Sequence, residues 1–200
     1  MTQAPILQTD RLILRPHRAE DFPACRLLWN DPAVVRHIGG QPQDGQATWF
    51  RILRYAGMWS LLGYGMWALE DRASGALLGE AGLLSAARGI AELEDVPEAG
   101  WVLAPTGWGR GLATEAMRSV LHWADRHLDA PVTRCIIQSD HAASIRVATK
   151  SGFTHFADRM LGAAPIRLFE RVRATGAEGG IDVPPSAFRD HAASAGSESP

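Results

Sequence analysis

The clearest chemical signal in the sequence lies in one stretch, where a short apolar run leads directly into glycines. The run is Gly100-Trp-Val-Leu-Ala104, and Gly107-Trp-Gly-Arg-Gly111 follows it. Apolar side chains then recur at helical spacing, so we expect a strand, a glycine-rich turn and a helix in that order. The first turn of a helix has unpaired N–H groups and a partial positive charge, and glycine lets a ligand approach the backbone. This order favours the binding of a phosphate or diphosphate.

Two common phosphate motifs fit this stretch poorly. A Walker loop carries a lysine after its glycines, and none stands here. The dinucleotide fingerprint G-x-G-x-x-G/A is matched only in part by Gly109 and Gly111, because Thr114 occupies its third position. The pattern therefore indicates a diphosphate site without an ATPase or nicotinamide signature. A glycine-rich turn that serves packing alone is the alternative.

Elements on both sides of this stretch must position it. The periodicity predicts helices at about 19–29, 46–62, 112–128 and 142–151, the last with Asp140 as its N-cap. It predicts strands at 11–15, 65–70, 76–84, 100–104, 133–138, 153–156 and 166–172. Residues 71–75 are turn-rich, so the second and third strands should form an antiparallel hairpin. Helices precede and follow this run of strands, and the predicted class is α+β (mixed α/β).

Length and composition favour one domain, at 1–173, followed by an Ala/Gly/Ser/Pro-rich tail at 174–200 that we expect to be mobile or loosely docked. The net charge of −2 gives no pull toward nucleic acid or an anionic membrane. The first residues lack a signal-peptide pattern and no stretch is long enough to span a bilayer, so we expect a cytoplasmic protein. Cys25 and Cys135 are too few and too far apart for a disulfide framework or a zinc site, which predicts two core residues and no metal. A cysteine nucleophile paired with a histidine is the alternative.

The glycine stretch also resembles a known family. Trp108-Gly-Arg-Gly-Leu-Ala-Thr-Glu-Ala116 is similar to the acetyl-CoA diphosphate loop of the GNAT superfamily, and within it to the RimJ/RimL-like branch of ribosomal-protein N-acetyltransferases. Further landmarks of that branch occur in the same order from residue 9 to 172. They are Thr9-Asp-Arg-Leu-Ile-Leu-Arg15, Asp31-Pro32, Tyr64-Gly65, Gly75 with Leu78-Gly79, and Ala143-Ser-Ile-Arg-Val147 with Ser151-Gly-Phe153.

The resemblance implies a central, mostly antiparallel twisted sheet that splays between its fourth and fifth strands. The acyl chain of acetyl-CoA would lie in that gap and pair with the backbone of Val102 and Leu103. The diphosphate would lie on the loop and the first turn of the helix. The loop residues expected to contact the cofactor are Trp108, Gly109, Arg110, Gly111, Leu112, Ala113 and Thr114. His141 stands where the family has an asparagine, and Ser144 matches a family serine; both are expected beside the cofactor.

Acetyl transfer to an amine by direct attack, which the resemblance implies, needs a base for the ammonium and an acid for the departing thiolate. Glu98 resembles the family's glutamate before the fourth strand and is the first candidate base. Glu80 is the second, and either could be a solvated charge instead. The tyrosine that many members use as the acid has no counterpart at its position, since the two tyrosines lie far upstream. Ser144 is the candidate replacement, unless its hydroxyl bonds the backbone.

The sequence therefore predicts an acetyl-CoA-dependent N-acetyltransferase that acts on a primary amine, either a protein N-terminus or a small molecule. The expected partners are acetyl-CoA and the amine, without nucleic acid or membrane, and the protein would be a monomer or homodimer. The main alternative is a non-catalytic acyl-CoA-binding module, which the missing tyrosine keeps open. An enzyme for a longer acyl-CoA and another acceptor, or an interaction module without CoA binding, are further alternatives.

Overall fold

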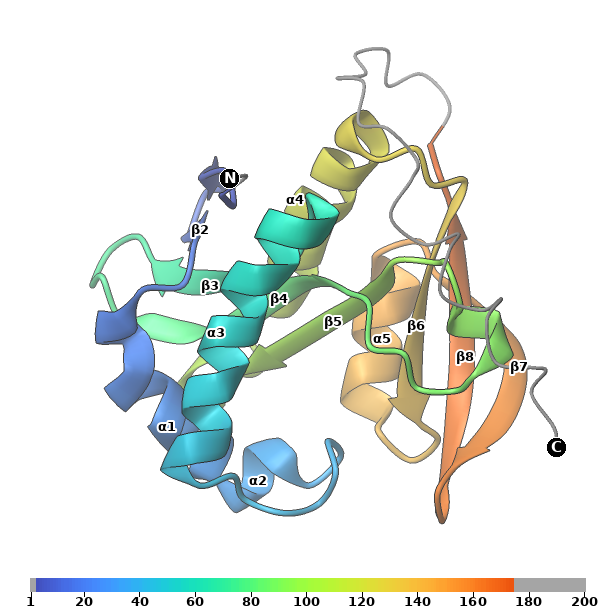
Figure 1. The fold of residues 1–200 in the computed structure, drawn as a ribbon, viewed down its shortest axis with the longest axis horizontal. Helices are drawn as coiled ribbons and strands as arrows, with labels where there is room; N and C mark the ends of the chain where they lie inside the picture. The colour runs from blue at the N-terminus through green and yellow to red at the C-terminus, as the bar shows by residue number, and fades with distance from the viewer. Residues whose placement is uncertain (1–2, 175–200) are drawn as a thin grey trace, which may run out of the picture.

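The computed structural model describes residues 3–174, and Figure 1 shows their arrangement. One sheet of eight strands runs through the molecule in the order β1-β2-β3-β4-β5-β6-β8-β7. Every neighbouring pair is antiparallel except β5 and β6. The predicted mixed α/β class with a mostly antiparallel sheet is therefore confirmed. Residues 175–200, which make up nearly all of the predicted tail, lie outside the described residues. Within residues 3–174, no helix has the length and apolar character needed to cross a membrane.

The strands are β1 (Leu7–Gln8), β2 (Leu12–Arg15), β3 (Met66–Asp71), β4 (Leu77–Leu84), β5 (Glu98–Leu103), β6 (Val132–Gln138), β7 (Thr154–Leu161) and β8 (Ala164–Val172). The α-helices are α1 (Phe22–Asn30), α2 (Pro32–Val35), α3 (Gly45–Leu62), α4 (Leu112–His127) and α5 (Ala142–Lys150). Short 3₁₀ turns lie at Ala19–Asp21, Ala91–Leu93 and Pro105–Gly107.

These elements follow the predicted ones closely, with differences that have local causes. The first predicted helix opens as a 3₁₀ turn and becomes α-helical only at Phe22. Asp31, expected to end that helix, also begins α2, because its carboxylate accepts a hydrogen bond from the N–H of Ala33 at 2.8 Å. The prediction of Asp140 as the N-cap of α5 is wrong. His141 is the N-cap and makes no side-chain capping bond, so α5 starts directly from the turn after β6.

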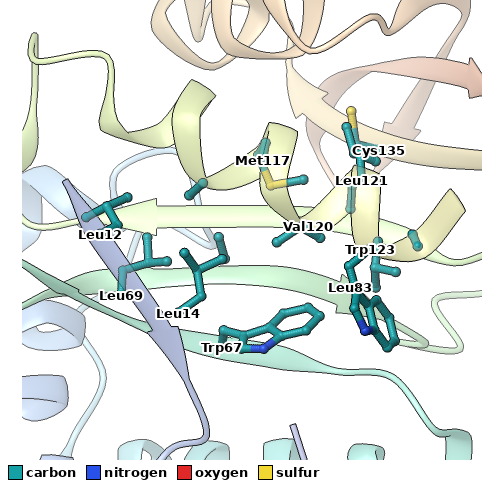
Figure 2. Packing of buried hydrophobic residues seen from close by; sticks show 14 of the residues in the cluster. Leu12, Leu14, Trp67, Leu69, Leu83, Met117, Val120, Leu121, Trp123 and Cys135 are labelled. Atoms are coloured by element: carbon teal, nitrogen blue, oxygen red, sulfur yellow. The ribbon is translucent and has the colours of Figure 1, made fainter. Parts of the chain in front are cut away.

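The core lies between the sheet and α4, whose apolar stripe faces the strands (Figure 2). Met117 and Val120 are fully buried there. Removing a side chain of this size from water contributes roughly 1.5–3 kcal/mol, so the stripe anchors α4 firmly to the sheet. At one end Trp59, Trp67 and Trp123 pack edge to face, with ring centroids 4.6–5.3 Å apart. Cys135 and Cys25 are buried free thiols, as the sequence predicts.

The two faces of β4 lead to different surroundings because side chains alternate along a strand. Ala81 and Leu83 belong to the core that contains α4. Glu80 points the other way, toward α1 and α3. Gly79 lets β4 approach β5 closely, since its φ is +155° and a Cβ there would lie 2.1 Å from the carbonyl oxygen of Val102. This close contact fixes where β5 lies.

The sheet opens between β5 and β6. These two strands are parallel and share a single register pair, Glu98 with Arg134. Beyond that pair they are no longer hydrogen-bonded to each other, whereas β4–β5 and β6–β8 continue as long antiparallel ladders. The splay predicted between the fourth and fifth strands of the family fold is thus present, with Glu98 at its closed end.

Candidate active site

A cavity of about 520 Å³ lies at this opening. Its walls come from α1, α3, β5, β6 and α5, and include Trp29, Arg51, Glu98, Val102 and Ser144. The closed end of the splay and the first turn of α5 therefore face the same space as α3. Glu98, Val102, His141 and Ser144, which the sequence selects from distant segments, all line it. Glu80 is not part of this lining.

β5 presents one backbone edge to the cavity. Ala104, directly after the strand, donates its N–H to β4, and Pro97, directly before it, accepts from β6. Pairing alternates along an antiparallel ladder, so Val102 also directs its N–H and C=O to β4. The peptide groups of Trp101 and Leu103 point to the opposite edge, where β6 has diverged. The peptide groups that face the gap are therefore those of Trp101 and Leu103, whereas Val102, from which a backbone contact is expected, presents its side chain to the cavity.

The glycine stretch forms an N–H-rich loop at the end of β5. Gly111 is the N-cap of α4 with φ +76°, and the first helical bond runs from Glu115 N to Gly111 O. No residue among 3–174 accepts a backbone hydrogen bond from the N–H groups of 109–114. The indole N–H of Trp108 donates to the carbonyl of Leu103 at 2.7 Å, which ties the loop to the strand. Such a row of free donors at a helix N-terminus is suited to a diphosphate.

Three residues that the sequence reasoning did not assign to the site, Glu115, Thr9 and Arg11, hold this loop in place. Glu115, in the first turn of α4, accepts from Thr9 Oγ1 at 2.6 Å and from Arg11 Nε at 2.7 Å. Arg11 Nη1 also donates to the carbonyl of Arg110 at 2.8 Å. Burial tends to raise the pKa of Glu115, but the bonds from Thr9 and Arg11 outweigh it and the pKa is lowered. The sequence could have indicated this contact, because Arg11 and Glu115 both lie in segments that resemble the family.

Glu98 is the candidate base that faces the cavity. It is the first residue of β5, not a loop residue before it, and it is only 5% exposed. Arg88 holds its carboxylate with two nitrogens, Nε at 2.9 Å from Oε2 and Nη2 at 3.1 Å from Oε1. The guanidinium fixes the orientation of the carboxylate at the point where β5 and β6 meet.

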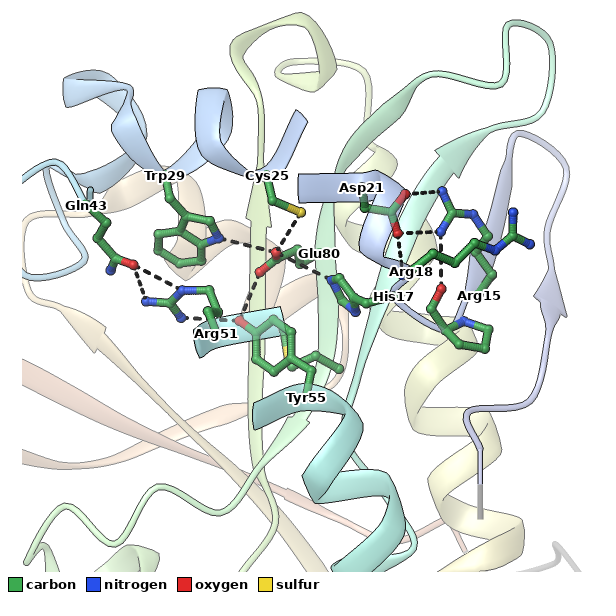
Figure 3. A network of polar contacts seen from close by, with 12 residues as sticks. Arg15, His17, Arg18, Asp21, Cys25, Trp29, Gln43, Arg51, Tyr55 and Glu80 are labelled. Carbon is green, nitrogen blue, oxygen red and sulfur yellow. Dashed lines mark hydrogen bonds and ion pairs between the residues drawn. The ribbon is translucent and has the colours of Figure 1, made fainter. Parts of the chain in front are cut away.

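Glu80 lies behind the cavity wall and is fully buried (Figure 3). Its carboxylate accepts from Trp29 Nε1 at 3.2 Å and from Tyr55 Oη at 2.9 Å, and Cys25 Sγ lies 3.7 Å away. His17 Nε2 is 3.4 Å from Oε1 without hydrogen-bond geometry. Burial alone would raise the pKa of Glu80, but His17 and the hydrogen-bonded neighbours outweigh it and hold the pKa below its ordinary value.

Within the described part of the chain, part of this cluster also has the spacing of a possible metal site. Potential ligand atoms of His17, Cys25 and Glu80 lie within 4.8 Å of one another. The sequence did not bring these residues together. Both oxygens of the carboxylate already accept hydrogen bonds from Trp29 and Tyr55, so we interpret the group as a hydrogen-bond cluster.

Tyr55 is a further cavity residue that the sequence reasoning left out of the site. Its position on α3, far upstream of the usual tyrosine, excluded it from the site, yet it lines the cavity. Its hydroxyl donates to Glu80 and accepts from Arg51 Nη1 at 3.2 Å. Burial, and then the negative charge of Glu80, raise its pKa, so the phenol stays protonated at neutral pH. Only the packing of α3 on β4 creates this contact, and no local pattern predicts it.

His141 and Ser144 line the opposite wall, at the start of α5. His141 stacks on His37, with ring centroids 4.1 Å apart and planes at 12°. Burial, and then His37, lower the pKa of His141 to about 4, so the ring is neutral at physiological pH. His37 Nδ1 lies 3.0 Å from the side-chain oxygen of Gln138. The Ser144 hydroxyl has no hydrogen-bond partner within the described residues, so it is not committed to the backbone.

The arrangement can accept an elongated ligand with a diphosphate at one end. The N–H-rich loop suits the phosphates. The open edge of β5, at Trp101 and at the N–H of Leu103, suits amide groups of an extended chain. Such a chain would lead toward the cavity that contains Glu98 and Ser144. The residues present therefore fit acetyl-CoA, with a carboxylate and a hydroxyl facing the space in which its acyl end would lie.

Comparisons with known proteins agree with this geometry. Residues 11–154 match the model of the acetyltransferase (GNAT) domain. YkkB of Bacillus subtilis (strain 168) is 31% identical over 172 residues, which cover 82% of this chain and 94% of YkkB. The structure of a putative GnaT-family acetyltransferase from Bordetella pertussis has a TM-score of 0.76 at 30% identity, and the match covers 84% of this chain and 100% of that one. RimL, a ribosomal L7/L12 alpha-N-protein acetyltransferase in complex with coenzyme A, is similar in fold, with a TM-score of 0.70 at 16% identity over 84% of this chain and 98% of RimL.

Proposed function

Because the chain belongs to the GNAT acetyltransferase family, we propose that it moves the acetyl group of acetyl-CoA to a primary amine by direct attack. The observation that carries this proposal is the junction of β5 with α4. The open edge of β5, at Trp101 and at the N–H of Leu103, runs into a loop whose N–H groups have no acceptor within residues 3–174. RimL, which has this fold, is described as a complex with coenzyme A.

In this reaction the amine nitrogen bonds to the thioester carbonyl carbon and the C–S bond breaks. The amine loses one proton and the sulfur gains one. Acetyl-CoA supplies the activated carbonyl. Glu98 takes the amine proton, directly or through a water, because it is the carboxylate that lines the cavity. Glu80 is the second candidate, and its path to the cavity passes through Tyr55.

Ser144 is proposed to donate the proton to the departing sulfur, since its hydroxyl faces the cavity uncommitted. His141 lies beside it as a neutral ring and contributes hydrogen bonds instead of charge. The acceptor is proposed to be a primary amine, either a protein N-terminus or a small molecule.

Titration of CoA into the protein, followed by thiol release over a panel of amines, tests this function. We expect CoA to bind and at least one amine to be acetylated. Binding of CoA with no thiol release from any amine would support an acyl-CoA-binding module instead. Failure to bind CoA would refute both functions.

A further inference from the structure

Arg51 lies on α3 at the cavity wall, and three neighbours fix its guanidinium (Figure 3). The guanidinium carbon lies 3.6 Å above the ring centroid of Trp29. Nε and Nη2 donate to the side-chain oxygen of Gln43 at 3.2 and 2.9 Å. Nη1 donates to Tyr55 Oη at 3.2 Å. A planar group held on one face and at two edges keeps one orientation. The side chain therefore loses little further conformational entropy when a ligand binds it.

The contacts of Arg51 leave part of its hydrogen-bonding capacity unused. A guanidinium has five N–H donors, and these neighbours take three of them. One N–H on Nη1 and one on Nη2 remain without a partner in the described part of the chain. Arg51 also makes no ion pair with a carboxylate of residues 3–174. One free N–H on each of two nitrogens of a fixed guanidinium can bond the two oxygens of a carboxylate.

The other charges around the cavity also favour a negatively charged ligand. Its lining includes Arg51, Arg54 and Arg88 but only one carboxylate, Glu98. Arg88 is already paired with Glu98 at 2.9 Å. Glu80 lies behind Tyr55 with no exposed surface, so it offsets the charge of Arg51 only in part. The α3 side of the cavity therefore presents an excess of positive charge, from Arg51 and Arg54, which disfavours a polycationic acceptor and favours an acidic one.

We infer that the acceptor is a small amine that also carries a carboxylate, such as an amino acid or short peptide, and that Arg51 holds this carboxylate in a two-point hydrogen bond. The inference rests on the proposed function and specifies its substrate class.

Matched pairs of acceptors test the inference. Glycine, 4-aminobutyrate, aspartate and glycylglycine are each compared with the corresponding carboxamide, and spermidine serves as a polycation. The measurement is kcat/KM for thiol release from acetyl-CoA. We expect at least one carboxylate to exceed its amide by about tenfold or more, the range of a lost charged hydrogen bond. Arg51→Gln should bring that ratio close to one while CoA affinity stays within about threefold.

Two further variants separate recognition from a structural effect. Arg51→Lys keeps the charge without the planar pair of donors, so it should give an intermediate ratio. Arg26→Gln removes the same charge from an exposed position on α1 outside the cavity lining, and it should leave the ratio unchanged. A binding measurement avoids dependence on turnover. N-acetylglycine and the other N-acetylated acids should bind the CoA-saturated protein more tightly than their amides.

Equal or better use of the amides, or a preference for spermidine, would overturn the inference and leave the proposed function intact. So would a protein that binds CoA but binds no N-acetyl carboxylate better than its amide. A carboxylate preference that survives Arg51→Gln would overturn the role of Arg51. Loss of CoA binding by the wild type would count against the proposed function itself.

Discussion

Gly111→Asp places a negative charge where the diphosphate of CoA is proposed to lie. Gly111 caps α4 at φ +76°, and only Arg11 Nη2 comes within 4 Å of the position of a Cβ, at 3.7 Å. The side chain therefore fits. The left-handed backbone costs about 1 kcal/mol in a residue other than glycine, and Asp and Asn tolerate it best. We expect the variant to remain folded.

The expected loss of affinity follows from Coulomb's law. At about 5 Å in water, two unit charges interact with about 0.8 kcal/mol, so one carboxylate against two phosphate charges gives about 1.7 kcal/mol. This corresponds to roughly a 15-fold weaker Kd. Water is the appropriate medium because Gly111 is exposed. Arg11 can pair with the new carboxylate and offset part of the loss, and salt should reduce it further.

The assay is calorimetric titration of CoA at low and at physiological ionic strength. Gly111→Asn is the matched neutral variant, with nearly the same shape and backbone strain. Gly63→Asp is the positional control, because Gly63 also has φ +72° with open space and ends α3 away from the glycine loop. Equal Kd values for Gly111→Asp and Gly111→Asn at low salt would refute the placement of the diphosphate.

Three further predictions concern single residues. Glu98→Gln should lower kcat at neutral pH by about 10²-fold or more, with a loss that shrinks toward the pKa of the amine; a loss that does not change with pH would indicate positioning instead. Glu80→Gln leaves the buried donors of Trp29 and Tyr55 with a weaker acceptor, so the free energy of unfolding in urea should fall by about 3 kcal/mol, and a change below about 1 kcal/mol would contradict this. The folded pKa of Glu80 lies below 4.5, so its carboxylate stabilises the fold above that pH, and the contribution is lost as pH falls through the folded value. The free energy of unfolding of Glu80→Gln should therefore decline less on the acid side than that of the wild type. His141, with its pKa lowered from 6.5 to about 4, binds a proton in the unfolded chain first, so stability should fall as pH drops across this range, and His141→Asn should flatten that part of the stability curve. Stability curves with the same slope between pH 6.5 and about 4 in the wild type and in His141→Asn would contradict the lowered pKa of this ring.

The sequence by itself determined the features that depend on neighbours along the chain. The strand, glycine turn and helix around Gly111 are encoded locally, because apolar periodicity and positive-φ glycines act within a few residues. The stripe of α4 is of the same kind, and it predicted which face meets the sheet. The resemblance of these segments to one family then implied the splay at β5, which the single pair between Glu98 and Arg134 confirms.

Tertiary structure decided which edge of the strand each peptide group faces and which residues from distant segments come into contact. Trp101 and Leu103, and not Val102, turn their peptide groups to the gap, because a strand's pairing edge is set by its partner and not by its own sequence. Glu80 and Tyr55 look unrelated in sequence, yet packing of α3 on β4 joins them in a buried cluster. The same packing places Arg51 at the cavity and leaves two of its donors without a partner among residues 3–174, since long-range burial selects which polar groups find partners.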